Sequence, residues 1–469
     1  MIEKILFALL LSTFGFLCFV TANVSAADFV DNSKNDLLEE KRVVIGMTGG
    51  VDSIVAAFLL QKQGFQCIGI GIVFVDEEEV KQAIIKATPK EEEYSFGSTA
   101  KKDLTIEEKV KFLQEGCSVK DLDKVNAICA RLDIPFYAVN AKEEYKEYIL
   151  DPFVASKLSG DIFIPCVACN GLKMDILYEK AKLLNATYIA TGHYAKIYRQ
   201  EDLNCYHIYS SNDDEYDQSY FLSNLQQRHL EKLILPLADL RKKDVIKIAE
   251  TFGLPNEFRR DSRVICFNSK GNSFLIEAYS APSFRPEGVV INNKTDMQYG
   301  EHRGVHHYFV GQTDIPVKEG IGRKEIERDK VVVQITPPNK VFVGDREDLT
   351  FNICAVNNVL LAPFFDTSTP ATVFIRYAID KDRVKAMLYF KALNVCLIQF
   401  EEEIFGLAKG LHLTFYDKEK QGGKVIGSGK IFFLQNSNFK VKDESDIDPE
   451  QLEEEKIKHR TALEDGFSL

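Results

Sequence analysis

The sequence Gly46-Met47-Thr48-Gly49-Gly50-Val51-Asp52-Ser53 carries the strongest structural signal in this chain. It follows the apolar run Val43–Ile45 and precedes the apolar segment Ile54–Leu60. This pattern predicts a buried strand, a tight glycine turn and a helix in succession. Adjacent glycines let backbone N–H groups approach an anion closely, and the N-terminus of the following helix adds the positive end of its dipole. The turn therefore suits a pyrophosphate group.

The side chains of this loop add to the interpretation. Thr48 and Ser53 supply hydroxyl groups, and Asp52 can hold a metal or orient the turn. The loop is not a Walker loop, because the Gly-Lys-Ser/Thr ending is missing. An ordinary glycine turn is the alternative, and a lone Gly-Gly pair would favour it. The complete pattern favours anion binding.

Length and composition are those of a soluble globular protein with two or three domains. The chain has 469 residues, of which 45% are hydrophobic and 27% charged, and its net charge is −12. This charge argues against a surface coated with basic residues, but it leaves room for a local basic surface that binds nucleic acid. The 10 cysteines form no dense framework, which argues against a small disulfide scaffold.

Apolar strands alternate with helical stretches from Arg42 to about Tyr198, which predicts a doubly wound parallel α/β sheet with ligands at the carboxyl ends of its strands, in a domain that spans residues 42–260. The expected strands are Val43–Gly46, Cys67–Val75, Phe136–Val139 and Tyr188–Thr191, and the expected helices are Ile54–Gln63, Leu122–Leu132, Met174–Leu184 and Lys243–Phe252. Residues 76–115 interrupt this pattern. They are rich in Glu and Lys with little apolar periodicity, so we expect a surface insertion there.

Short β-rich segments replace the alternation from about residue 261 onward. They are His306–Val310, Lys330–Ile335, Lys340–Val343, Thr372–Tyr377, Leu393–Phe400, Leu413–Tyr416 and Lys424–Phe433. Because Gly and Asp turns separate them, we expect a small central domain (261–345) and a C-terminal β-barrel (346–436). An acidic tail (437–469) follows.

Two cysteine-containing stretches are candidates for chemistry. Cys166 and Cys169 form a Cys-x-x-Cys pair at the start of a predicted helix, a position that lowers the pKa of a thiol, and Cys266 is the second candidate. Three interpretations compete: zinc binding, buried structural thiols, and sulfur chemistry in which one cysteine carries a persulfide and another resolves the product disulfide. No second Cys-x-x-Cys or His pair supports zinc. A pyrophosphate loop in the same chain favours sulfur chemistry, because an activated carbonyl needs a nucleophile.

The loop resembles the Ser-Gly-Gly-x-Asp-Ser loop of ATP pyrophosphatases, which activate a carbonyl oxygen as an adenylate. With further motifs in the same order, the chain resembles the bacterial-type tRNA-specific 2-thiouridylases (tRNA-uridine 2-sulfurtransferases) over about residues 42–433. Those motifs are Cys117–Leu122, Pro165–Asn170, Tyr188–Ala195, Asp217–Leu222, Asp261-Ser262 with Ile265–Phe267, Gly304–Gln312, Ile375–Tyr377 and Gly427–Gly429.

This resemblance implies a three-domain enzyme that clamps the anticodon arm of a tRNA. The family uses ATP with Mg²⁺ to adenylate the 2-carbonyl oxygen of the wobble uridine and releases pyrophosphate. Persulfide sulfur then attacks carbon 2, and AMP leaves. The implied partners are tRNAs with Lys, Glu and Gln type anticodons and a persulfide donor, such as a cysteine desulfurase or a relay protein. No stable membrane insertion is expected.

The resemblance also implies roles for individual residues. Cys266 is the expected persulfide carrier, and Cys169 is the partner thiol that forms the disulfide. The implied ATP contacts are Gly46, Met47, Thr48, Gly49, Gly50, Val51, Asp52, Ser53, Ile72 and Gly192. The residues expected to face the target base are Ile164, Pro165 and Cys166, and those expected to touch tRNA are Tyr216, Asp217, Gln218, Arg376 and Tyr377.

Three departures from the family pattern concern the site. Many relatives carry an Asp with an acid/base role where Cys166 stands, so the proton-handling group is unassigned here. Thr48 replaces the usual Ser and keeps the hydroxyl. The chain has no Trp, so the family's Met-Lys-x-Trp stretch near the nucleotide is missing.

The histidines allow more than one interpretation. His193, at a predicted strand end, is either a hydrogen-bonded structural residue or a phosphate or adenylate contact. His302, His306 and His307 form a local cluster without Cys or carboxylates at ligand spacing. We therefore interpret this cluster as surface or central-domain residues and predict no metal centre.

Two other functions stay open. A pyrophosphate-loop ligase or amidotransferase that acts on a small molecule would not need Cys169 and Cys266. A non-catalytic tRNA-binding or sulfur-carrier-binding relative would keep the fold without turnover. The missing Trp stretch and Cys166 favour that relative, whereas the intact loop and both thiols argue against it.

The N-terminus is typical of a secretory leader. Lys4 precedes the apolar run Ile5–Val20, and Val24-Ser25-Ala26 offers a small-x-small cleavage site. We expect a cleaved leader (1–26) and a linker or transit segment (27–41). Because ATP and reduced thiols are scarce outside the cell, the leader indicates an organelle. A plastid reached through the secretory route is favoured, and a mitochondrion is the alternative.

Overall fold

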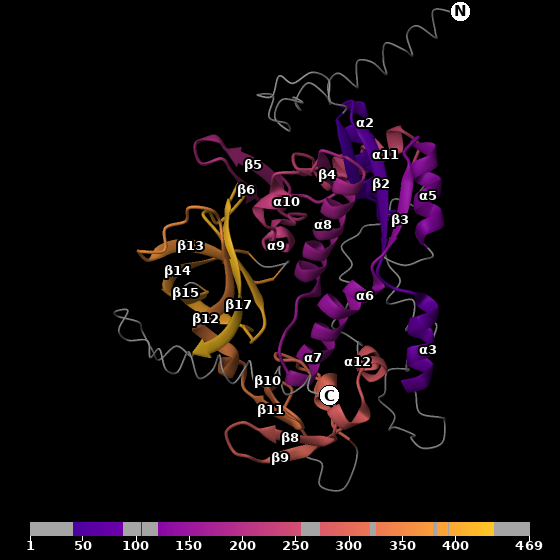
Figure 1. Ribbon diagram of the computed structural model, residues 1–469. Coiled ribbons are helices and arrows are strands. Elements are labelled where there is room, and N and C mark those ends of the chain that lie inside the picture. The colour runs from indigo at the N-terminus through magenta and orange to yellow at the C-terminus, as the bar shows by residue number, and fades with distance from the viewer. Residues whose placement is uncertain are drawn as a thin grey trace, which may run out of the picture.

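A parallel α/β domain, a small central sheet and a C-terminal barrel make up the computed structural model (Figure 1), which confirms the predicted fold class. It describes residues 41–87, 105, 121–254, 273–318, 325–378, 382–392 and 394–435. The predictions for the leader, the Cys117 motif, Cys266 and the acidic tail lie outside these residues. Among the described helices, none is long and apolar enough to cross a membrane.

The first domain is built on a five-stranded parallel sheet in the order β3-β2-β1-β4-β7. Its strands are β1 (Arg42–Gly46), β2 (Gln66–Val73), β3 (Phe136–Asn140), β4 (Tyr188–Ala190) and β7 (Leu233–Ile234). Val43, Val44 and Ile45 of the central strand β1 are fully buried. A continuous apolar run fits this position because helices cover both faces of the sheet.

The faces of the sheet bury alternate residues of β1. Val43 and Ile45 pack with helices α2, α5 and α11, whereas Val44 packs with α8 on the opposite face. The helices of this domain are α2 (Val51–Lys62), α3 (Glu77–Ala87), α5 (Asp121–Arg131), α6 (Lys142–Tyr145), the π-helical η2 (Lys146–Leu150), α7 (Asp151–Ser159), α8 (Pro165–Leu183), α9 (Ser219–Leu222), α10 (Gln227–Leu230) and α11 (Lys242–Thr251). A hairpin of β5 (Lys196–Gln200) and β6 (Cys205–Tyr209) follows β4, with a short 3-10 turn, η3 (Glu201–Leu203), between its strands.

The first part of the predicted surface insertion is a packed helix. Helix α3 buries Val80 and Ile84, which share an apolar cluster with Phe274 of helix α12 (Ser273–Tyr279). The expectation of little apolar periodicity was therefore wrong for residues 77–87. Val80 and Ile84, about one helical turn apart, are its buried apolar residues, and the surrounding Glu and Lys residues obscured this short pattern.

The central sheet has the order β10-β11-β8-β9. Its strands are β8 (Gly288–Asn292), β9 (Gln298–His302), β10 (Val331–Thr336) and β11 (Lys340–Gly344), and a 3-10 turn, η5 (Pro282–Phe284), precedes them. The predicted strand His306–Val310 was wrong, because Val305–His307 form a 3-10 turn, η6. Gly304 has a φ of +142°, and the chain turns there directly after β9.

The C-terminal domain is a closed antiparallel barrel in the order β12-β15-β14-β13-β16-β17. Its strands are β12 (Thr350–Leu361), β13 (Ala371–Arg376), β14 (Val384–Ala392), β15 (Val395–Phe405), β16 (His412–Tyr416) and β17 (Val425–Gln435), preceded by η7 (Arg346–Leu349). Cys354, Val373, Leu388, Ile398 and Phe415 are fully buried in its interior. In Figure 1 the barrel stands beside α8 and α9 of the first domain.

Candidate active site

The pyrophosphate loop lies between β1 and α2, at the carboxyl end of the central strand. Gly49 has a φ of +76°, in the left-handed region that favours glycine, and extended Gly50 is the N-cap of α2. The hydroxyl of Ser53 accepts a hydrogen bond from the N–H of Thr48 at 3.2 Å and donates one to the carbonyl of Gly50 at 3.0 Å. Ser53 therefore closes the loop, which leads into the positive end of the helix dipole.

Asp52 is held beneath the loop by a buried cation. The Nζ atom of Lys242, at the start of α11, lies 2.7 Å from Oδ1 and 2.8 Å from Oδ2 of Asp52. The hydroxyl of Tyr194 donates a second hydrogen bond to Oδ1 at 2.7 Å. The side chains of Lys242 and Asp52 are only 6% and 9% exposed. Of the two roles open to Asp52, these contacts favour orienting the turn over holding a metal.

Lys242 was not predicted from the sequence. This residue lies 190 positions from Asp52 in the chain, and a lysine in the first turn of a helix is usually solvated. Its ammonium also lies 5.7 Å from the ring centroids of both Tyr194 and Tyr216. The position of Tyr194 just beyond β4 was the only signal in the sequence, because strand ends of this sheet meet at one edge.

Gly192 has no room for a side chain. A Cβ atom at this position would lie 2.6 Å from the carbonyl carbon of Asp52 and 2.8 Å from the backbone nitrogen of Ser53. The backbone after β4 therefore packs directly on the first turn of α2. This close approach explains the glycine without a ligand, and the implied ATP contact of Gly192 stays a prediction.

His193 is neutral at physiological pH. Burial, with a smaller contribution from the charge of Lys173, lowers the pKa of His193 to about 3. Its Nδ1 lies 2.8 Å from the hydroxyl of Thr191, so the hydrogen-bonded interpretation of this histidine is confirmed. A contact with phosphate or adenylate remains untested.

Helix α8 carries the two cysteines of the Cys-x-x-Cys pair in its first two turns. Pro165 occupies its first turn, and extended Ile164 is the N-cap. Cys166 is half-buried, whereas Cys169 is 7% exposed and lies in an apolar cluster with Phe74, Phe153 and Phe274. Ile72 of β2 packs against the same cluster. The structure therefore places the predicted ATP contact Ile72 and the predicted partner thiol Cys169 at one apolar cluster.

Cys266 lies outside the described residues, so its pairing with Cys169 stays a prediction. The described chain resumes at Ser273, and Phe274 and Leu275 of α12 enter the cluster that contains Cys169. Among the described cysteines, which include Cys166 and Cys169, no two are joined by a disulfide.

The residues predicted to face the target base lie next to the barrel. Ile164 packs against the apolar core of the barrel, and the N–H of Ile162 donates to the carbonyl of Lys409 at 2.8 Å. Gly410 approaches the backbone of Ile162 so closely that a Cβ atom there would clash with it. The start of α8 is therefore fixed by the C-terminal domain.

Asp217 and Arg376 form a buried ion pair between the first domain and the barrel. Nη1 of Arg376 lies 2.8 Å from Oδ2 of Asp217, and the two side chains are 7% and 3% exposed. Ser219 donates to the same carboxylate oxygen at 2.8 Å, and Arg383 lies 3.6 Å from it. Further polar contacts across this interface join Ser223 to His412. The predicted tRNA contacts Asp217 and Arg376 thus bind one another, and their contact with tRNA stays a prediction.

Tyr216 and Gln218, the neighbours of Asp217 in the chain, contact Tyr194 and thereby support the pyrophosphate loop. Oε1 of Gln218 accepts a hydrogen bond from the N–H of Tyr194 at 3.0 Å, and the ring of Tyr216 lies 6.0 Å from that of Tyr194. Since Tyr194 donates to Asp52, a chain of contacts connects the segment 216–218 with the pyrophosphate loop. Tyr377, also predicted to touch tRNA, is half-buried against the barrel core.

A five-stranded parallel sheet with a glycine loop after its central strand, joined to an antiparallel barrel, defines a nucleotide-binding enzyme of the HUP-domain class. Residues 41–113 and 100–270 match the family described as the tRNA methyl transferase HUP domain, which implies use of ATP. Residues 353–431 match the aminomethyltransferase beta-barrel domain.

Relatives with known names define the family more closely. The chain is 32% identical to the tRNA-specific 2-thiouridylase MnmA of Clostridium beijerinckii over 84% of its own length and 99% of that protein. It is 32% identical to MnmA of Clostridium perfringens over 83% of this chain and 99% of that protein. It is 30% identical to MnmA of Clostridioides difficile over 83% of this chain and 98% of that protein. The chain therefore belongs to the tRNA-specific 2-thiouridylase family, whose members are sulfurtransferases.

Similarity to solved structures is much weaker. NMN synthetase from Francisella tularensis has a TM-score of 0.28 and 16% identity over 49% of this chain and 68% of that one. This likeness is too weak to bear on the function.

Proposed function

We propose that this protein uses ATP to replace the 2-oxygen of the wobble uridine of tRNA with sulfur. The observation that carries the proposal is the position of Cys169, at the start of a helix and in one apolar cluster with Ile72 of the nucleotide-binding sheet. The same cluster contains Phe274, eight residues after Cys266 in the chain. Family membership supports the same activity.

The chemistry proceeds in two stages. The uridine 2-carbonyl is a poor electrophile until its oxygen attacks the α-phosphorus of ATP and pyrophosphate leaves. The terminal sulfur of a persulfide on Cys266 then attacks carbon 2, and AMP departs with the oxygen. The thiolate of Cys169 attacks Sγ of Cys266, which breaks the persulfide bond, leaves sulfur on the uridine and forms a Cys169–Cys266 disulfide. An external thiol reduces this disulfide before the next turnover.

The described residues assist the first stage by position and charge. The loop amides and the N-terminus of α2 bind the pyrophosphate that leaves. Lys242 and Tyr194 hold Asp52 and thereby the first turn of this helix. Mg²⁺ would come bound to ATP and offset the charge of its phosphates. Because Asp52 is already bound by Lys242 and Tyr194, the loop itself offers no free carboxylate to that ion.

The test is a reconstituted thiolation reaction. The protein without residues 1–41, unmodified tRNA for Lys, Glu or Gln, ATP, Mg²⁺ and a persulfide source are incubated, and 2-thiouridine is measured by mass spectrometry. We expect product from the wild type and from Cys129→Ser, a matched control at a buried cysteine on the opposite face of the sheet. We expect none from Cys169→Ser or Cys266→Ser.

The other outcomes separate the alternatives. Product that survives Cys169→Ser would show that the thiol assignment is wrong, and Cys166→Ser would then be tested. Bound tRNA without product, and without tRNA-dependent exchange between ATP and pyrophosphate, would indicate a non-catalytic relative. ATP turnover that does not depend on tRNA and persists in the Cys169→Ser and Cys266→Ser variants would indicate a ligase or amidotransferase for a small molecule.

We also propose that residues 1–41 direct the protein to an organelle, with a plastid favoured. The support is the sequence alone, in which an apolar run precedes a small-x-small site. Fluorescence microscopy of a reporter fused to residues 1–41 tests this proposal, and a reporter that stays in the cytosol would contradict it.

A further inference from the structure

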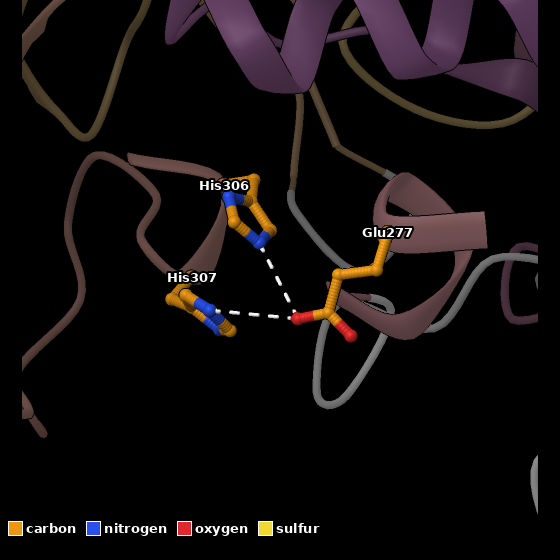
Figure 2. A group of neighbouring side chains, drawn as sticks. All are labelled: Glu277, His306 and His307. Atoms are coloured by element: carbon orange, nitrogen blue, oxygen red, sulfur yellow. Dashed lines mark ion pairs between the residues drawn. The ribbon is translucent and has the colours of Figure 1, made fainter. Parts of the chain in front are cut away.

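Three side chains with metal-binding atoms meet between α12 and the central domain. Figure 2 shows Glu277 of α12 pointing toward His306 and His307 of η6, with Oε1 of Glu277 facing a ring nitrogen of each histidine. One potential ligand atom from each residue lies within 4.8 Å of those of the other two. The group was not predicted from the sequence, because Glu277 lies 29 positions before His306, far beyond the short spacing of local ligand motifs.

The spacing of these atoms is close to that of a zinc site. Nε2 of His306 lies 3.5 Å from Oε1 of Glu277, and Nε2 of His307 lies 3.7 Å from the same oxygen. In a tetrahedral site with metal–ligand bonds of about 2.0 Å, ligand atoms lie about 3.3 Å apart. The contacts are too long for good hydrogen bonds, so the present arrangement satisfies these groups poorly.

The buried imidazole of His306 is the feature that indicates a bound ligand. Its side chain is 1% exposed, and neither ring nitrogen has a hydrogen-bond partner among the described residues. A buried imidazole without a partner is costly, because its polar atoms have lost their contacts with water. A metal ion would satisfy one nitrogen and balance the carboxylate of Glu277.

We propose that Glu277, His306 and His307 bind one divalent transition-metal ion of the Zn²⁺ class. Two imidazoles and a carboxylate are borderline ligands that favour Zn²⁺ over Mg²⁺ or Ca²⁺, which prefer oxygen atoms alone. Glu277 and His307 are half-buried, so the ion has access from solvent and a water can complete the coordination. His302 is not a ligand, because its Nε2 lies 3.1 Å from the carbonyl of Asn339 and its Nδ1 accepts from Gly304.

The ion would join two parts of the chain. Glu277 belongs to α12, the first described helix after Cys266, and the two histidines belong to the central domain. Binding would fix α12 against η6 and would stabilise the folded chain by mass action. The site is separate from the pyrophosphate loop, so it does not depend on the proposed activity.

Cobalt titration of the full chain tests the proposal. The protein is stripped with a chelator and titrated with Co²⁺, whose visible absorption reports tetrahedral coordination, and Zn²⁺ is then added to displace it. We expect one Co²⁺ per chain, with no sulfur-to-cobalt charge-transfer band. Glu277→Gln and His307→Gln should each weaken binding by at least about tenfold. Glu301→Gln, which removes an exposed carboxylate from the same domain, should leave binding unchanged.

Thermal unfolding keeps the test independent of folding defects. Zn²⁺ should raise the Tm of the wild type and of Glu301→Gln but not that of Glu277→Gln, even if the metal-free Tm values differ. A folded protein that binds no Co²⁺ would overturn the proposal, as would equal binding by all three variants. A charge-transfer band that disappears in Cys169→Ser/Cys266→Ser would place the metal on the thiols and would also overturn it.

Discussion

The ammonium group of Lys242 lies 2.7 and 2.8 Å from the two carboxylate oxygens of Asp52, 190 residues earlier in the chain. Both side chains are buried, so the pair is shielded from water and salt. Removing one partner of such a pair leaves a buried charge without compensation, which is far more costly than losing an exposed ion pair. The first turn of α2, next to the pyrophosphate loop, therefore depends on a residue of α11.

We expect Lys242→Met to lower the free energy of unfolding by about 3–5 kcal/mol, because Asp52 loses its cation. The neighbouring Lys243 is exposed, so Lys243→Met should change the free energy of unfolding by no more than about 0.5 kcal/mol. Urea denaturation measures the free energy of unfolding of both variants. The double variant Asp52→Asn/Lys242→Met should recover part of the loss, and a single variant as stable as the wild type would contradict this role of the pair.

Gly192→Ala should displace the backbone that packs on the first turn of α2, beside the pyrophosphate loop. The new Cβ would lie 2.6 Å from the carbonyl carbon of Asp52, so the chain after β4 must move away from α2. We expect a loss of about 1–3 kcal/mol in stability and weaker binding of an ATP analogue. Gly300→Ala is the matched control, because its Cβ would make an ordinary contact of 3.4 Å with Val317. Equal affinity of Gly192→Ala and Gly300→Ala for the ATP analogue would contradict the importance of the close approach between Gly192 and Asp52.

Arg376→Met separates a structural role from a tRNA contact. Because Arg376 is paired with buried Asp217, we expect a stability loss of about 3 kcal/mol, and a similar loss for Asp217→Asn. The dependence of tRNA affinity on salt should stay nearly unchanged. If Arg376 instead neutralises a phosphate, the slope of log K against log salt should become shallower by about 0.7–0.9. Filter binding over a salt series distinguishes the two results.

Stability should fall as the pH drops below about 6.5, in part because of His412. Burial, with a smaller contribution from Lys430, lowers the pKa of His412 to about 3, whereas the unfolded residue titrates near about 6.5. Between these values only the unfolded chain binds the proton, so acid favours unfolding by up to about 1.4 kcal/mol per pH unit. Urea titrations at pH 6.5 and pH 5 give the free energy of unfolding of both proteins, and His412→Gln should lose less of it than the wild type. An equal loss in the two proteins would contradict the lowered pKa of His412 in the folded state.

The sequence predicted the parts of this fold that local patterns encode. The apolar run before the glycine loop specified a strand buried on both faces, and the loop itself specified the helix start. Strand β12 was not foreseen, because four consecutive residues of it, 353–356, are buried and the strand lacks a regular alternation of buried and exposed positions. The contacts that complete the site were also hidden. Lys242 and Arg376 each pair with a carboxylate far away in the chain, and a single sequence gives no signal for such pairing.

The barrel closes through its last strand. β17 pairs with β12 on one side and with β16 on the other, so residues 425–435 supply partners to two strands at once. During synthesis, those two strands present unpaired edges until the ribosome has released this segment. A premature stop codon before Val425 would make that exposure permanent. Such a truncated chain would retain the pyrophosphate loop, but its open edges would invite self-association with other copies.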